Sequence, residues 1–173
     1  SALVEGENQS AGNAAENIVA MEILQADGKF SCEIAFPGAK LWSPEEPNLY
    51  ACRVTFGEDV QEETFGIRMV SCTPENGFQI NGKRVLLKGG CIHHDNGLLG
   101  ACAYEFAERR KVRILLDAGY NAIRSAHNPC SKALLRACDE MGMLVMDEYI
   151  DGWYIHKTKY DYADEILDNY RKD

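Results

Sequence analysis

The sequence lacks several features that define whole classes of protein. None of its apolar runs approaches the roughly 18 residues of a membrane span, and its N-terminus has no basic stretch followed by an apolar core. Positive charge is scarce, because 18 Lys and Arg stand against 27 Asp and Glu and the net charge is −9. We therefore expect a soluble protein that binds neither membranes nor nucleic acid, since these partners favour basic surfaces.

Paired cysteine motifs are also missing. The seven cysteines are an odd number, widely spaced, and none forms a Cys-x-x-Cys pair, which argues against a zinc knuckle or a thioredoxin-type site. We interpret them as reduced thiols in the protein core, and we expect a reducing, cytoplasmic location. They are Cys32, Cys52, Cys72, Cys91, Cys102, Cys130 and Cys138.

The first part of the chain has the pattern of β-structure. The first 17 residues are small and polar, so we expect a loop or a chain end there. Short antiparallel strands with tight turns predict a β-sandwich, and four or five strands leave it incomplete. The alternating segments are residues 20–24, 30–34, 49–56 and 61–65, with a hairpin turn at Asp27-Gly28.

The pattern changes from Phe78 onward. A tight hairpin at Asn81-Gly82 leads to an apolar run, two further runs follow, and helical spacings separate them. This β-α-β-α-β order predicts a parallel sheet with right-handed crossovers. The runs are residues 85–87, 121–123 and 144–146, and the expected helices are 105–118, one from Asn128-Pro129 to Gly142, and a weak one at 161–172. We assign a polar N-terminal segment to 1–17, a sandwich portion to 18–72 and the start of a barrel to 73–173.

A polar cluster follows each of the three apolar runs. Barrel enzymes place their working residues just beyond the C-terminal ends of parallel strands, so these clusters predict one wall of an active site. The three predicted strands alone are too few to close a barrel, so they would form only part of one. The clusters are His93, His94 and Asp95; Arg124, Ser125 and His127; and Asp147, Glu148 and Asp151.

Each of these side chains also has a purely structural interpretation. His93 and His94 fit an ordinary surface loop; only one of two neighbours can face a given pocket, and we favour His94. Arg124 at a strand end is either half of a buried ion pair or a ligand clamp, and Glu148 is its expected structural partner. His127 is favoured as functional, because Asn128-Pro129 fixes the turn that aims it.

The segment after the third run combines an acid with aromatic rings. Asp151 and Trp153 fit a carbohydrate site, in which a carboxylate binds hydroxyl groups and a ring packs on the sugar. Trp153 also fits as packing at the barrel rim. His156 has no such context and is interpreted as a surface residue.

Ordered motifs along the chain resemble those of glycoside hydrolase family 2, which includes β-galactosidases and β-glucuronidases. Leu-Trp-Ser-Pro-Glu-Glu-Pro-Asn-Leu-Tyr at 41–50 and Phe-Gly-Ile-Arg at 65–68 resemble the end of the family's immunoglobulin-like domain. Residues 80–83, 88–95, 121–129 and 138–142, with Asp147-Glu148, resemble its barrel motifs. The resemblance implies an incomplete immunoglobulin-like β-sandwich followed by the first three βα units of a (β/α)8 barrel, with β-galactosidase as the nearest label.

The resemblance also implies roles for individual residues. His94 and His127 match histidines that contact the sugar or stabilise the transition state. Arg124 matches an arginine that orients the nucleophilic carboxylate, and we assign Glu148 to the same orienting role. Asp151 and Trp153 match a loop that often contacts the sugar. Ala126 and Asn128 depart from the family pattern, which commonly has Ser and Tyr at these positions.

The catalytic carboxyls are missing from the sequence. Retaining glycosidases need two of them about 5 Å apart, and the resemblance places the acid/base in an Asn-Glu pair after the fourth barrel strand. No Asn-Glu dipeptide occurs here. We expect the catalytic residues beyond Asp173, an inactive fragment, no metal and no cofactor. The expected partner is a β-galactoside or related carbohydrate. We also expect self-association through exposed strand edges and a homo-oligomeric parent protein.

Two other functions remain open from the sequence. A metal-dependent hydrolase barrel would use imidazole and carboxylate ligands, which His93, His94, His127, Asp95 and Glu148 could supply. A non-catalytic carbohydrate-binding module would need an aromatic platform such as Trp42. Against the metal-dependent hydrolase, Arg124 would repel a cation at the cluster. Against the binding module, we favour a packing role for Trp42.

Overall fold

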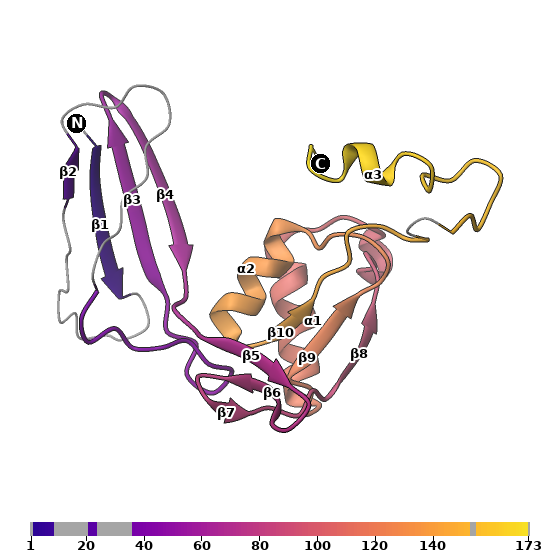
Figure 1. The fold of residues 1–173 in the computed structure, drawn as a ribbon, viewed down its shortest axis with the longest axis horizontal. Helices are drawn as coiled ribbons and strands as arrows, with labels where there is room; N and C mark the ends of the chain where they lie inside the picture. Colours follow the sequence, from indigo (N-terminus) through magenta and orange to yellow (C-terminus); the bar gives the residue numbers. More distant parts are fainter. Residues whose placement is uncertain (1, 9–20, 24–35, 153–154, 173) are drawn as a thin grey trace. The chain divides into compact units, whose positions relative to one another are not determined.

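The computed structural model describes residues 2–8, 21–23, 36–152 and 155–172. They belong to two compact units (Figure 1): unit 1 comprises Ser1–Leu87 with Cys138–Gly142, and unit 2 comprises Lys88–Ala137 with Met143–Asp173. In the described part of the chain, no helix is both long and apolar enough to cross a membrane.

Unit 1 contains a four-stranded antiparallel sheet with the order β2-β1-β3-β4. Its strands are β1 (Ala2–Asn8), β2 (Met21–Ile23), β3 (Tyr50–Phe56) and β4 (Asp59–Phe65). The hairpin of β3 and β4 is confirmed. The expected loop at 1–17 is wrong at its start, because β1 pairs with both β2 and β3 and thereby satisfies its backbone hydrogen-bonding groups. The predicted turn at Asp27-Gly28 and the strand at 30–34 lie outside the described residues.

A second sheet of unit 1 has the order β5-β6-β7, formed by β5 (Val70–Thr73), β6 (Gly77–Ile80) and β7 (Lys83–Arg84). Asn81 and Gly82 join β6 to β7 with φ values of 52° and 75°, as a two-residue hairpin turn requires. The expected strand at 85–87 is wrong: β7 ends at Arg84, and one further backbone hydrogen bond follows, from Val85 N–H to the Phe78 oxygen at 2.9 Å. The residues that pair in the parallel sheet come a few positions later.

Trp42 is a packing residue of unit 1. Its side chain is buried, its indole Nε1 donates to the backbone oxygen of Asp139 at 2.8 Å, and the Arg68 guanidinium lies 4.6 Å from its ring centre. A Cβ on Gly66 would lie 2.8 Å from Cβ of Trp42 and 2.9 Å from the nearest indole atoms. Because the ring is buried by these contacts, it cannot serve as an exposed platform for a sugar. The packing role that we favoured for Trp42 is therefore supported.

Unit 2 is built on a parallel three-stranded sheet with the order β10-β9-β8. The elements of this part of the chain follow one another as β8 (Gly89–Ile92), η1 (Gly97–Leu99), α1 (Glu105–Asp117), β9 (Ala122–Ser125), α2 (Lys132–Met141), β10 (Leu144–Met146) and α3 (Ile166–Asn169). The end of α2, from Cys138 on, belongs to unit 1. The predicted β-α-β-α-β order is confirmed (Figure 1). The C-terminal helix is much shorter than the weak pattern over 161–172 indicated.

The start of α2 differs from its prediction. The hydroxyl of Ser131 accepts a hydrogen bond from the backbone N–H of Leu134 at 3.1 Å, which is the contact of an N-cap. The helix therefore begins at Lys132, and not at Asn128-Pro129. Asn128 instead accepts from the Ser125 hydroxyl through its backbone oxygen at 2.7 Å, so it belongs to the loop after β9.

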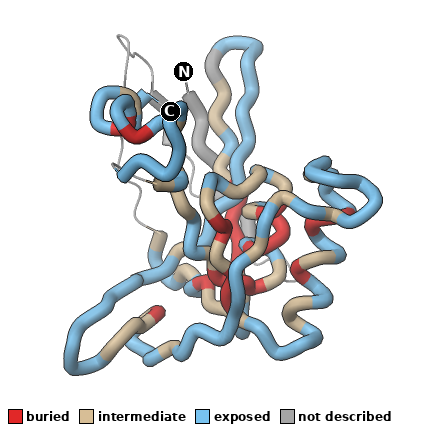
Figure 2. Tube along the Cα trace, turned by 90° about the vertical axis from the view of Figure 1, so that its right-hand side faces the viewer, coloured by how far each residue is buried: buried red, intermediate tan, exposed pale blue. Residues whose placement is uncertain are grey.

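The buried side chains of the two longer helices follow the helical period. In α1, Glu108 and Val112 are buried one turn apart, and in α2, Leu134 and Cys138 are buried one turn apart. Figure 2 colours the chain by burial. The interpretation of the cysteines as core thiols holds for Cys138. It is wrong for the three that the structure places in exposed positions, Cys72, Cys91 and Cys102.

Two adjacent glycines of β8 offer a matched test of the parallel sheet. A Cβ at Gly89 would lie 1.9 Å from the backbone oxygen of Ala122, whereas a Cβ at Gly90 would meet nothing within 4 Å. We expect Gly89→Ala to destabilise the protein at or above the upper end of the roughly 1–3 kcal/mol that overpacking costs. Gly90→Ala should change the free energy of unfolding by less than about 0.5 kcal/mol. Urea unfolding of both variants measures this, and equal stability of the two would contradict the close strand approach.

Candidate active site

Glu148 connects the ends of two neighbouring strands. It follows β10, and its Oε1 accepts hydrogen bonds from the guanidinium of Arg124, which lies in β9. Its Oε2 lies 2.9 Å from Nδ1 of His127, just beyond β9. The ion pair expected between Arg124 and Glu148 is therefore confirmed, and His127 shares the same carboxylate.

The electrostatics of this cluster favour the ionised carboxylate. Burial raises the pKa of Glu148, but hydrogen bonds from His127 and Arg124 outweigh it, so the pKa lies below its usual value. Contacts with the Cys91 sulfur and with Glu148 raise the pKa of Arg124. Because an ionised carboxylate can only accept hydrogen bonds, Nδ1 of His127 must carry the proton.

The cluster is open to solvent on its cationic side. The Glu148 side chain is 15% exposed, whereas the side chains of Arg124 and His127 are 43% and 41% exposed. The carboxylate thus lies beneath the two groups that it holds, and these groups can still reach a ligand.

The loop that carries His127 is held at two further points. The Ser125 hydroxyl donates to the Asn128 backbone oxygen at 2.7 Å, and the Asp147 carboxylate accepts from the Cys130 backbone N–H at 2.9 Å. The peptide bond between Ala126 and His127 is cis. Burial raises the pKa of Cys130 to about 11, so its thiol stays protonated at neutral pH. Asp147 therefore has a structural role in this loop.

The structure places His93 beside His127. Their ring centres lie 6.1 Å apart in an edge-on arrangement, and both rings belong to loops at strand ends. His94, which we favoured from the sequence, is partly buried and makes no hydrogen bond or ion pair with any residue that the structure describes. Its sugar-binding role stays a prediction, and His93 is the imidazole that reaches the cluster.

Asp151 is exposed and pairs with the ammonium group of Lys157. The hydrogen bond from Lys157 lowers the pKa of Asp151, so this carboxylate is also ionised at neutral pH. The other predicted sugar contact of this segment, Trp153, lies outside the described residues. The roles of Asp151 and Trp153 in sugar binding stay predictions.

Cys91 was not identified as a site residue. Nη1 of Arg124 donates to its sulfur at 3.5 Å, so the guanidinium lies between a thiol and a carboxylate. The available signal was the strand register, because Cys91 pairs with Arg124 across β8 and β9. The misplacement of β8 at residues 85–87 hid that signal.

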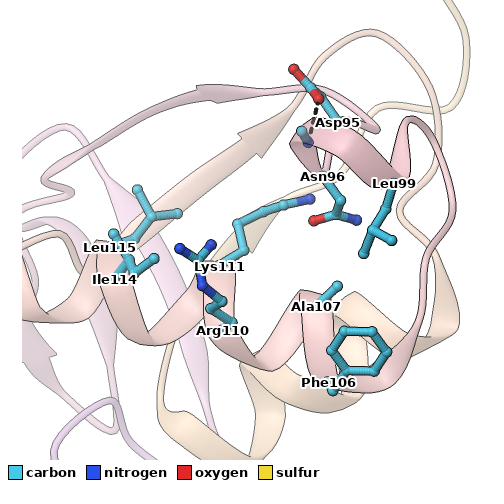
Figure 3. Close-up of a pocket in the computed structure, with 10 residues that line it drawn as sticks. Asp95, Asn96, Leu99, Phe106, Ala107, Arg110, Lys111, Ile114 and Leu115 are labelled. Carbon is cyan, nitrogen blue, oxygen red and sulfur yellow. Dashed lines mark hydrogen bonds between the residues drawn. The ribbon is translucent and has the colours of Figure 1, made fainter.

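A separate groove of about 420 Å³ lies between the loop after β8 and helix α1 (Figure 3). Its apolar lining includes Leu99 and Phe106, and Arg110 and Lys111 add positive charge. The cluster around Glu148 does not line it. Within the described ranges, no group of three or more His, Cys, Asp and Glu side chains is arranged to hold a metal ion.

The protonation of His127 gives a direct spectroscopic test of the cluster. We expect the neutral ring to carry its proton on Nδ1, because the Glu148 carboxylate accepts it. The ¹⁵N chemical shifts of the ring distinguish the two tautomers. Glu148→Leu, which removes the acceptor, should return the ring to the mixture of a free imidazole, and Glu75→Leu is a control on an exposed turn. An Nε2–H ring in the unchanged protein would refute this geometry.

Comparisons with known proteins extend over both units. The family model for "Glycosyl hydrolases family 2, TIM barrel domain" matches residues 73–161, and the model for "Glycosyl hydrolases family 2" matches residues 2–68. A putative beta-glucuronidase from Formosa agariphila is 38% identical over 168 residues, which cover 87% of this chain and 16% of that protein. A beta-galactosidase from Bacteroides ovatus is 38% identical over 139 residues, which cover 78% of this chain and 16% of that protein.

Solved structures show the same likeness. A glycosyl hydrolase family 2 member from Bacteroides cellulosilyticus is 41% identical with a TM-score of 0.73, covering 99% of this chain and 23% of that one. A beta-glycosidase from Bacteroides vulgatus is 31% identical with a TM-score of 0.72, covering 99% of this chain and 22% of that one. The chain thus spans less than a quarter of each of these four proteins. Since the TIM-barrel model alone matches more than half of its residues, the chain belongs to glycosyl hydrolase family 2.

Proposed function

We propose that the protein hydrolyses terminal β-glycosidic bonds of β-galactosides, and that this chain supplies a sugar-binding wall of the active site. The observation that carries the proposal is the cluster of Arg124, His127 and Glu148 at adjoining strand ends. Barrel enzymes bind their substrates at this edge of the sheet. The cluster combines rigid positioning with exposed hydrogen-bonding groups, which a hydroxyl-rich ligand needs.

The carboxylates of this site are suited to holding other groups. A general acid needs a raised pKa so that it is protonated at neutral pH. Glu148 has a lowered pKa and both of its oxygens are engaged. Asp151 also has a lowered pKa, caused by Lys157. We therefore expect this chain to bind a sugar and not to cleave it, with the two catalytic carboxyls supplied by sequence beyond these residues.

The charge balance of the cluster supports a neutral sugar. A glucuronide carries a carboxylate that would need a cation of its own. Arg124 already pairs with Glu148, and Lys157 already pairs with Asp151. This pairing favours a galactoside.

A glucuronide is the second candidate, because the Formosa relative that aligns over 87% of this chain is described as a putative beta-glucuronidase. Self-association and a cytoplasmic location stay predictions.

Sugar titration of the 173-residue chain, followed by NMR, tests this proposal. Methyl β-galactoside should shift the Arg124 side-chain and His127 signals, and methyl β-glucuronide should bind more weakly. His127→Phe keeps an aromatic ring but removes its hydrogen-bonding groups, which should weaken binding by about 1–2 kcal/mol, or roughly 5–30-fold. Tyr160→Phe, at an exposed position, is the control.

Release of nitrophenol from nitrophenyl β-galactoside completes this experiment. We expect no turnover by the chain alone. Turnover would contradict the proposed division between binding wall and catalytic carboxyls. Galactoside binding that is unchanged in His127→Phe would contradict the proposal that this cluster binds the sugar. Tighter binding of the glucuronide would favour the second candidate.

A further inference from the structure

A second polar cluster lies in the segment that follows the candidate site. The carboxylate of Asp161 accepts hydrogen bonds from the backbone N–H groups of Lys157 at 2.6 Å, Thr158 at 3.1 Å and Ala163 at 3.1 Å. We call residues 155–164 the clasp, because this one carboxylate closes the segment into a loop. The bond from Thr158, together with the others, holds the pKa of Asp161 well below its usual range, so the closing group is an anion.

His156 lies between two carboxylates of the clasp. Its Nδ1 is 2.8 Å from Asp161 and its Nε2 is 3.1 Å from Asp164. A neutral imidazole has one donor and one acceptor nitrogen, whereas both facing groups can only accept. Both contacts are therefore satisfied only by the doubly protonated, cationic ring. The sequence alone gave His156 no role beyond the surface.

The clasp is connected to the candidate site through Lys157. This residue follows His156, its backbone N–H binds Asp161, and its ammonium group pairs with Asp151. The clasp therefore includes the backbone of the residue that holds Asp151. Within the described residues, the charged groups that face the His156 ring are Asp161 and Asp164.

We propose that His156 and Asp161 are positioning residues that fix Asp151 through Lys157, and that the clasp loosens when His156 loses its second proton. Only the consequence for the ligand rests on the proposed function and on the sugar contact that the sequence predicts for Asp151. The coupling between the clasp and Asp151 depends on the contacts of this segment alone.

The direction of the pH dependence follows from the two carboxylates. Asp161 and then Asp164 raise the pKa of His156 above its ordinary value of about 6.5. The stabilisation of the clasp is therefore fully present below about pH 6.5 and is lost as pH rises through the raised pKa. Asp161 is the stronger partner, because its side chain is 20% exposed and that of Asp164 is 87% exposed.

The pKa of the Asp151 carboxyl, measured by ¹³C NMR, tests the coupling. His156→Gln removes the cationic ring that bridges the two carboxylates. The pKa of Asp151 should therefore rise toward the ordinary value of about 3.9. Lys159→Gln removes a positive charge from the same segment and should leave the pKa of Asp151 unchanged. An unchanged pKa in His156→Gln, or an equal rise in Lys159→Gln, would overturn the proposal.

A titration of the unchanged protein gives a second test that needs no variant. The backbone amide signals of Lys157, Thr158 and Ala163 should shift with the same midpoint as the His156 ring, above pH 6.5. Amides that do not follow the ring, or a ring that titrates at or below 6.5, would overturn the proposal. Neither test involves a sugar, so failure of the clasp and failure of the proposed function are distinguishable. If the coupling holds, a galactoside affinity that falls through the same midpoint would connect it to the site.

Discussion

The carboxylate of Glu148 is the constraint on which the candidate site depends. It connects the end of β10 to Arg124 in β9 and to the His127 loop, and each of its oxygens has its own partner. Without it, a guanidinium and an imidazole would share one strand end with no common anion. The arrangement also requires that the strands lie in the right register, and Gly89 allows β8 to approach Ala122 closely.

This constraint supports the proposal that the site is a binding wall. Charges that are paired and hydrogen-bonded are held in place before a ligand arrives, and such preorganisation favours binding and orientation. The same pairing lowers the pKa of Glu148 and removes it from acid catalysis. Asp151 is likewise paired with a cation, the ammonium group of Lys157, on the segment that follows. In this family 2 chain, the described carboxylates near the strand ends therefore act on other protein groups.

The parts of this structure that depend on local periodicity could be predicted from the sequence. The helical spacing over 105–118 corresponds to α1 at Glu105–Asp117, and the run at 144–146 corresponds to β10. The pairing of Arg124 with Glu148 also followed from their places at parallel strand ends. The parts that depend on tertiary pairing could not be predicted. β1 lies in a stretch that is mostly small and polar, and β8 consists of Gly-Gly-Cys-Ile, which has no alternating signal. The contacts of His156 required a loop closure that no local pattern encodes.

The most direct measurement of the central claim is the pKa of the Glu148 side-chain carboxyl, followed by ¹³C NMR in the folded protein. Its two cationic or polar partners should hold the pKa below the ordinary glutamate value of about 4.3. A value at or above 4.3 would mean that Arg124 and His127 do not stabilise the anion, and would contradict the account of the site.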